Sequence, residues 1–147
     1  FTFKMMRLRH SAIVVENFER VLSFYQSLDL ELDSRQVEQG KFIDSLVGIF
    51  NAKIETAKLN FPGGGRLEIL HYHSHKVEKS SEHLSVNKIG HSHIAITVDD
   101  ISHVVNRIIQ LGGSLINLPA ISPDGLVSAC YCRDPEGNIL EIVEVQS

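Results

Sequence analysis

Long apolar runs, a strong excess of one charge and paired cysteine motifs are all missing from this chain of 147 residues. No apolar stretch approaches the ~20 residues that a membrane-spanning helix needs. A net charge of −4 gives no electrostatic reason to expect nucleic acid or an anionic membrane as a partner. The two cysteines, Cys130 and Cys132, have a spacing that suits neither a CxxC redox pair nor a zinc knuckle. We therefore expect a cytoplasmic protein with two reduced thiols.

The composition is that of an ordinary soluble globular protein, with 43% hydrophobic and 22% charged residues. A chain of this length can bury one substantial core and is short for two independent ones. The sequence therefore predicts a single domain.

An internal repeat organises this domain. The segment "RHSAIVVENFERVLSFYQSLDLEL" from Arg9 aligns with "SHIAITVDDISHVVNRIIQLGGSL" from Ser92, so that His10 matches His93. The phrase "PGGGRLEIL" likewise matches "PEGNILEIV", and Glu68 matches Glu141, with about ten more residues between His and Glu in the first copy. Each copy therefore begins with a histidine and closes with a glutamate that lies within an apolar strand, where a lone carboxylate is costly to bury.

Each copy has the pattern of a β-α-β-β-β unit. "HSAIVV" and "HIAITV" alternate as strands do, and "FERVLSFYQSL" and "ISHVVNRIIQL" have helical spacing after turns that suit a helix start. Gly112-Gly113 ends the second helix. The remaining strands are predicted at Glu31 to Val37, Ile54 to Phe61, Arg66 to Tyr72, Ser114 to Leu118, Val127 to Arg133 and Ile139 to Val145. The polar segment between the two copies, about 74–89, is predicted to be a linker.

These motifs resemble those of the vicinal oxygen chelate superfamily, which includes glyoxalases, bleomycin resistance proteins and extradiol dioxygenases. The resemblance rests on "RHSAIVVENFERVLSFY", "GHSHIAITVDDI" and "DPEGNILEIVE" and covers nearly the whole chain. It implies an α+β fold in which two βαβββ modules, about 7–73 and about 90–146, form an eight-stranded open U-shaped sheet around a metal site. It also implies a homodimer, and it implies four metal ligands: His10, Glu68, His93 and Glu141.

The chemistry of these four residues agrees with that implication. Two imidazoles and two carboxylates suit one divalent ion such as Zn²⁺, Ni²⁺, Co²⁺, Mn²⁺ or Fe²⁺. The two carboxylates cancel the charge of the ion, which removes the objection to burying either glutamate. The alternative, that these are ordinary strand residues, requires the same coincidence in both copies.

The four-ligand set predicts a metal-dependent lyase or isomerase of glyoxalase type. The expected reaction is proton transfer through a metal-bound enediolate on a small substrate with vicinal oxygens, with Glu68 or Glu141 as the base. A first alternative is an extradiol-type ring-cleaving dioxygenase that holds iron with His10, His93 and Glu141. A second alternative is a metal-free protein that binds small molecules such as drugs. The sequence leaves open which metal and substrate are used, whether glutathione takes part, and whether one chain or two complete the site.

The other histidines have weaker signals. "HYHSH" places three histidines on the side of a strand opposite to Glu68, which favours a solvated segment. His91 shares the face of His93 and is a candidate to support it. His83 and His103 have the pattern of surface residues. "GKFIDSLVGIF" from Gly40 indicates a helical turn, and its pattern does not distinguish a lid from a core element.

Overall fold

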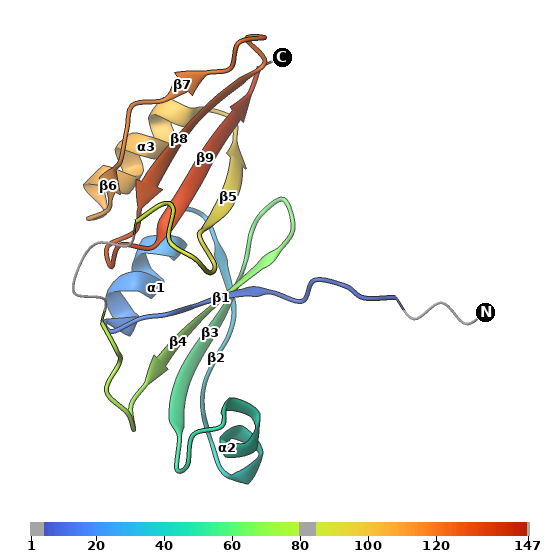
Figure 1. Cartoon of the computed structure of the whole chain (residues 1–147), viewed down its shortest axis with the longest axis vertical. Helices are drawn as coiled ribbons and strands as arrows, with labels where there is room; N and C mark the ends of the chain where they lie inside the picture. The colour runs from blue at the N-terminus through green and yellow to red at the C-terminus, as the bar shows by residue number, and fades with distance from the viewer. Residues whose placement is uncertain (1–4, 80–84, 147) are drawn as a thin grey trace. The chain divides into compact units, whose positions relative to one another are not determined.

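The computed structural model describes residues 5–79 and 85–146; His83 and part of the predicted linker lie outside these ranges. The elements, drawn in Figure 1, confirm the α+β class and the doubled βαβββ order, with a helix α2 added in the first copy and a strand β7 in the second. They are β1 (Ser11–Val14), α1 (Phe18–Gln26), β2 (Glu31–Gln39), α2 (Lys41–Val47), β3 (Lys53–Asn60), β4 (Arg66–Tyr72), β5 (His93–Val98), α3 (Ile101–Gln110), β6 (Ser114–Leu115), β7 (Ala120–Ile121), β8 (Val127–Arg133) and β9 (Ile139–Val145).

The chain forms two compact units, and one segment of the first repeat belongs to the second unit. Unit 1 consists of the chain up to Phe18 and of Asp29–Val77, and unit 2 consists of Glu19–Leu28 and the chain from Glu78 onward. Most of α1 therefore belongs to the first repeat by sequence and to unit 2 by its contacts.

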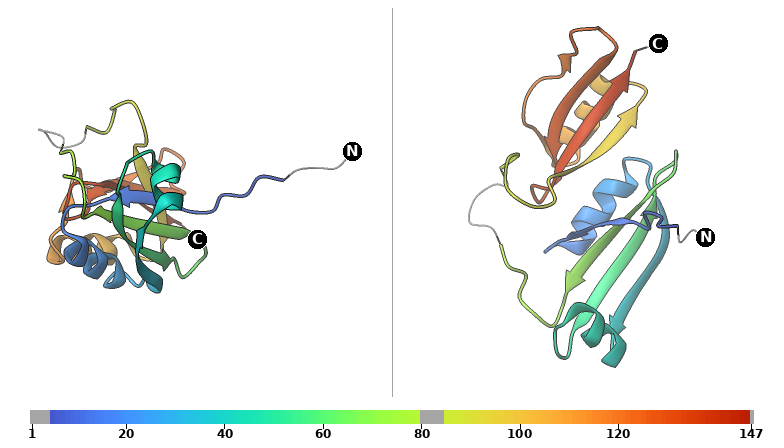
Figure 2. Two further views of the ribbon diagram at one scale, coloured as in Figure 1. Left: turned by 90° about the horizontal axis from the view of Figure 1, so that it is seen from below. Right: turned by 45° about the vertical axis from the view of Figure 1, so that its right-hand side comes forward.

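Unit 1 is built on an open four-stranded sheet in the order β1-β4-β3-β2, seen in two further views in Figure 2. β1 pairs with β4 in parallel, and the other pairs are antiparallel. One face of this sheet carries buried apolar side chains: Ile13, Val15, Ala57, Leu59, Leu67 and Ile69. On the opposite face Ile43 of α2 clusters with Ala52 and Ile54, and Leu70 and Tyr72 pack against them. Because Leu70 and Tyr72 alternate with Ile69, α2 covers part of the face to which Glu68 also belongs.

Unit 2 contains an open sheet in the order β5-β9-β8-β6, with β7 paired to β8. Helix α3 contacts β6, β8 and β9. It begins where the sequence predicts, because the Asp100 side chain caps it by accepting a hydrogen bond from the backbone N–H of His103 at 3.0 Å. The strand predicted over Ser114–Leu118 is shorter than expected and ends at Leu115. The N–H of Ile116 still donates to the carbonyl of Tyr131 on β8 at 2.9 Å, and β7 then pairs with β8 at Ala120–Ile121.

A buried carboxylate anchors α1 in unit 2. The Tyr25 hydroxyl donates a hydrogen bond to Asp134 Oδ2 at 2.8 Å, and both residues are almost fully buried. Asp134 also accepts from Asn138 Nδ2 and from the backbone N–H groups of Glu136 and Asn138, at 2.8–3.0 Å. Burial, and after it the Asp134 carboxylate, raises the pKa of the Tyr25 phenol well above its usual value. One polar group thus ties the helix to the turn between β8 and β9.

The two cysteines lie side by side on β8, as the alternation predicts. Their Sγ atoms are 4.0 Å apart, and both thiols are free and buried. Burial, followed by the neighbouring Cys130, raises the pKa of Cys132 to about 12, so this thiol stays protonated and unreactive at neutral pH. Within residues 5–79 and 85–146, no helix has both the length and the apolar character to cross a membrane.

Candidate functional site

Two turns with the same backbone hydrogen bonds position the two predicted glutamates. In unit 1 the N–H of Phe61 donates to the carbonyl of Gly65, and the N–H of Gly64 donates to the carbonyl of Phe61, both at 3.0 Å. In unit 2 the N–H of Asp134 donates to the carbonyl of Asn138 at 2.9 Å, and the N–H of Gly137 donates to the carbonyl of Asp134 at 3.0 Å. Three residues after the start of each turn lies a glycine with a positive φ, which favours glycine. The φ is 107° at Gly64 in unit 1 and 91° at Gly137 in unit 2. Each glutamate follows its turn at the same distance, Glu68 on β4 and Glu141 on β9.

The pairing of the strands is also the same in both units. In unit 1 Ala12 of β1 lies opposite Glu68 in a parallel pair, and in unit 2 Ala95 of β5 lies opposite Glu141. Each histidine comes two residues before this alanine, on the same face of its strand. The repeat read from the sequence therefore places a histidine diagonally across from a glutamate in each unit.

The pair in unit 1 is the more enclosed of the two. His10 Nε2 lies 3.6 Å from Glu68 Oε2, and the side chains are 27% and 12% exposed. His10 Nδ1 is buried and is the one buried side-chain nitrogen or oxygen that lacks a hydrogen-bond partner among the described residues. An unsatisfied buried nitrogen costs free energy, and Nε2 is the ring atom that faces Glu68.

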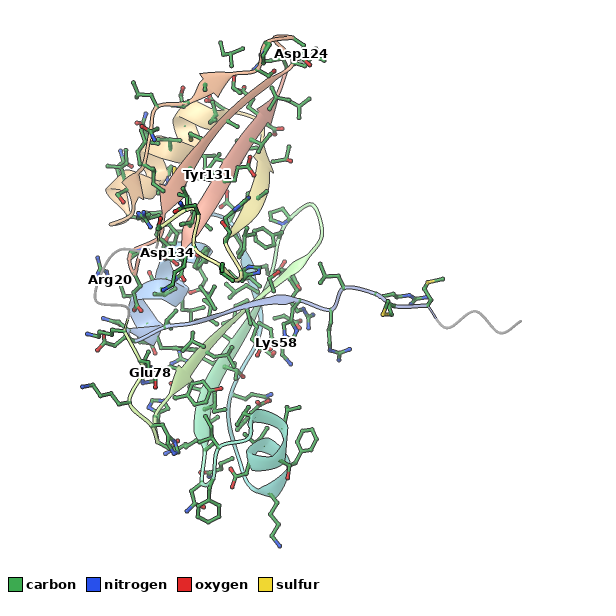
Figure 3. The ribbon with its side chains drawn as sticks, viewed as in Figure 1. Arg20, Lys58, Glu78, Asp124, Tyr131 and Asp134 are labelled. Atoms are coloured by element: carbon green, nitrogen blue, oxygen red, sulfur yellow. The ribbon has the colours of Figure 1, made fainter. Side chains whose placement is uncertain are left out.

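The pair in unit 2 has more side-chain support. His93 Nε2 lies 3.2 Å from Glu141 Oε2, with side chains 27% and 28% exposed. A hydrogen bond joins His93 Nδ1 to Ser92 Oγ at 3.0 Å, which directs Nε2 toward the carboxylate. The ring of Tyr131 on β8 lies 4.9 Å from the imidazole, centroid to centroid (Figure 3).

These donors fit a divalent cation in type and in spacing. Two ligands held at about 2.1 Å by one ion lie roughly 3.0–3.5 Å apart, close to the separations in both pairs. Neutral imidazole nitrogens and carboxylate oxygens are the donors that Zn²⁺, Ni²⁺, Mn²⁺ and Fe²⁺ accept. In the part of the chain that the structure describes, no group of three or more His, Cys, Asp or Glu side chains gathers closely enough to hold an ion, so each unit presents a pair.

Two residues beside the glutamates were missed by the sequence analysis. Lys58 of β3 is the cross-strand partner of Glu68, and Tyr131 of β8 is the partner of Glu141. Residues directly opposite in an antiparallel pair share a face, so both lie beside the candidate ligands. The signal was present, because both hairpins close at recognisable turns and residues equally far from a turn pair with each other.

The histidines of "HYHSH" lie apart from Glu68, as predicted. His71 pairs with Glu55 in the register, while Glu68 pairs with Lys58 on the alternate face. His71 Nδ1 forms a hydrogen bond with the carbonyl of Val15 at 2.9 Å, and His73 Nε2 lies 3.0 Å from Glu55 Oε1.

Two further predictions concern single histidines. The support expected from His91 was misplaced by one residue, because His91 is exposed and Ser92 contacts His93 instead. His103 is exposed, as expected.

Comparisons with known proteins agree with this architecture. The family model described as Glyoxalase/Bleomycin resistance protein/Dioxygenase superfamily matches residues 7–142. The chain is 26% identical over 144 residues to a lactoylglutathione lyase of Neisseria meningitidis serogroup A, covering 97% of this chain and 93% of the relative. A glyoxalase family protein from Bacillus cereus has a TM-score of 0.91 at 25% identity, covering 99% of this chain and 97% of that one. A glyoxalase I variant from Zea mays, with a TM-score of 0.64 at 18% identity, covers 91% of this chain and 43% of that one and shows the likeness of fold alone.

Proposed function

The chain belongs to the Glyoxalase/Bleomycin resistance protein/Dioxygenase superfamily, and from this membership we propose that it is a metal-dependent lyase or isomerase of glyoxalase type. Its substrate is a small molecule with vicinal oxygens. The observation that carries the proposal is the repeated His–Glu pair, at 3.6 Å in unit 1 and 3.2 Å in unit 2, in the same strand register.

The proposed ligands of one divalent ion are His10, Glu68, His93 and Glu141. Members of the superfamily commonly use such an ion, and when bound it would polarise a substrate carbonyl and make the neighbouring C–H bond more acidic. The Nε2 atoms of the two histidines face the carboxylates and supply neutral donors.

The two carboxylates have complementary roles in this proposal. Together they neutralise a divalent charge, and one of them takes the proton from the carbon next to the carbonyl. A site with both carboxylates bound suits a substrate that gains negative charge, whereas a site with a single carboxylate suits an anionic catecholate and O₂. The presence of Glu68 at the same place as Glu141 therefore favours proton transfer over the dioxygenase alternative.

Metal content and proton exchange test this proposal together. Protein freed of metal by chelation and reloaded with Ni²⁺, Zn²⁺, Mn²⁺ or Fe²⁺ is expected to bind one ion per predicted ligand set, measured by elemental analysis. The loaded protein should then exchange deuterium from D₂O into the C–H next to the carbonyl of S-lactoylglutathione or a simple 2-hydroxy ketone, followed by NMR. A protein that binds no stoichiometric metal would instead be the metal-free binding protein.

The first specific prediction concerns Glu68→Gln. This change keeps the shape of the side chain but removes its charge and basicity, so proton exchange should fall by about 10²–10⁴-fold. The matched control is Glu144→Gln, three residues beyond Glu141 on the alternate face of β9, which should keep full activity. Full activity of Glu68→Gln, together with oxygen uptake on addition of a catechol, would establish the dioxygenase arrangement of His10, His93 and Glu141.

A further inference from the structure

A cation lies beside the glutamate of unit 1 and is not part of the repeat. Lys58 of β3 is the direct cross-strand partner of Glu68 of β4, so the two side chains leave the same face of the sheet. The lysine is partly buried, and Figure 3 labels it in unit 1. The equivalent position opposite Glu141 holds Tyr131, so the common strand architecture does not require a lysine here.

Lys58 has no carboxylate partner among the described residues, whereas two arginines of unit 1 each have one. Arg35 forms an ion pair with Glu55 at 2.7 Å, and Arg66 forms one with Asp33 at 2.9 Å. Lys58 makes neither an ion pair nor a hydrogen bond with any side chain within residues 5–79 and 85–146. Glu68, although adjacent, directs its Oε2 toward His10 instead.

The balance of charge in the proposed site indicates what kind of group Lys58 would bind. In the proposed function two carboxylates neutralise a divalent ion, so the ligand set needs no further positive charge. Lys58 therefore adds one positive charge that no ion pair with a described residue compensates. The ammonium group of this half-buried lysine would attract an anionic group of a ligand that binds beside Glu68.

We propose that Lys58 selects substrates that carry an anionic group, a carboxylate or a phosphate, in addition to their vicinal oxygens. This inference rests on the proposed function and adds the class of substrate. Cross-strand Cβ atoms lie about 5 Å apart, so the anionic group is expected within a few bonds of the oxygens that bind near Glu68. Lys58 is thus a specificity-determining residue, and the base remains Glu68 or Glu141.

Two ligands that differ by one anionic group test the role of Lys58. Dihydroxyacetone and dihydroxyacetone phosphate present the same adjacent carbonyl and hydroxyl oxygens, and only the second carries an anionic group. Binding of each to Co²⁺-loaded protein is measured by calorimetry and by the absorption of the cobalt ion. Lys58→Met should weaken the binding of dihydroxyacetone phosphate by about tenfold and leave that of dihydroxyacetone within about twofold. Lys58→Arg, which keeps the charge, should restore most of the difference.

Lys53→Met is the matched control, because Lys53 lies on the same strand with its side chain on the opposite face. It should leave both affinities unchanged, and the preference for the phosphorylated ligand in the wild type should shrink as salt is raised. Equal weakening of both ligands in Lys58→Met, or no binding of either to the cobalt-loaded protein, would overturn the role of Lys58 while metal binding itself still stood. Failure of the wild type to bind Co²⁺ would overturn the proposed function and this inference with it.

Discussion

The two units hold the same His–Glu pair on the same backbone and support it by different means. In unit 2 the turn before Glu141 is filled by the Asp134 carboxylate, which accepts four hydrogen bonds. In unit 1 the corresponding residue is Phe61, and the turn has only its two backbone bonds. The same contrast holds for the histidines, since Ser92 contacts His93 Nδ1 and the residue before His10 is Arg9.

The two repeats therefore keep the same positions for the histidine and the glutamate, and they differ in the side chains that form hydrogen bonds around them. The pair of unit 2 is held in place by side chains of its own unit. The pair of unit 1 is more enclosed, with Glu68 only 12% exposed and His10 Nδ1 unsatisfied. Because Glu68 is less exposed than Glu141, a cation would offset a larger cost of burying the carboxylate in unit 1 than in unit 2.

The largest expected effect comes from removing the support that only unit 2 possesses. Asp134→Ala leaves the buried Tyr25 hydroxyl and two part-buried backbone N–H groups without their acceptor. We expect the free energy of unfolding to fall by about 3 kcal/mol, measured by urea denaturation. Asp124→Ala, at an exposed loop carboxylate, is the control and should cost far less. A small effect of Asp134→Ala would mean that the turn of unit 2 needs its carboxylate no more than the turn of unit 1 does.

A second prediction uses the raised pKa of Tyr25. A group whose pKa is higher in the folded state stabilises the fold fully below its unfolded pKa, near 10, and loses this contribution as pH rises through the folded value. The free energy of unfolding should therefore fall above about pH 10 by up to about 1.4 kcal/mol per pH unit. Tyr25→Phe should be less stable near neutral pH and should lack the share of the alkaline decline that comes from Tyr25, keeping only that of the buried thiol of Cys132. Parallel pH curves for the two proteins would contradict the anchoring role of the buried phenol.

The smallest expected effect concerns the hydrogen bond to the histidine of unit 2. Ser92→Ala removes the partner of His93 Nδ1, so metal affinity should fall by up to about tenfold, measured by competition with a chelating dye. Arg9→Ala, at the equivalent position in unit 1, should leave metal affinity nearly unchanged, because His10 Nδ1 has no hydrogen-bond partner among the described residues. Equal losses in the two variants would remove the distinction between the two histidines.

Local patterns in the sequence were sufficient to predict most of the fold and both donor pairs. Alternation placed β5, β8 and β9 at their observed bounds, and the echoed phrases placed Glu68 and Glu141 after identical turns. The contacts of α1 with unit 2 were not predictable, because they depend on Tyr25 meeting Asp134 across 109 positions of the chain. Lys58 and Tyr131 required the register of a hairpin, which a hydrophobic pattern does not determine by itself. That the four proposed ligands bind one ion remains a prediction.

Because most of α1 belongs to unit 2, the protein cannot be cut into its two units at a single position of the chain. The chain passes from one unit to the other at residues 18–19, 28–29 and 77–78, so the units are connected by three peptide links. Proteolysis in the polar segment after residue 77 would sever a single link and leave both fragments joined through α1. A gene fragment that encodes only the second repeat would lack α1 and its Tyr25. The resulting protein would expose Asp134 and the surface of unit 2 that α1 contacts.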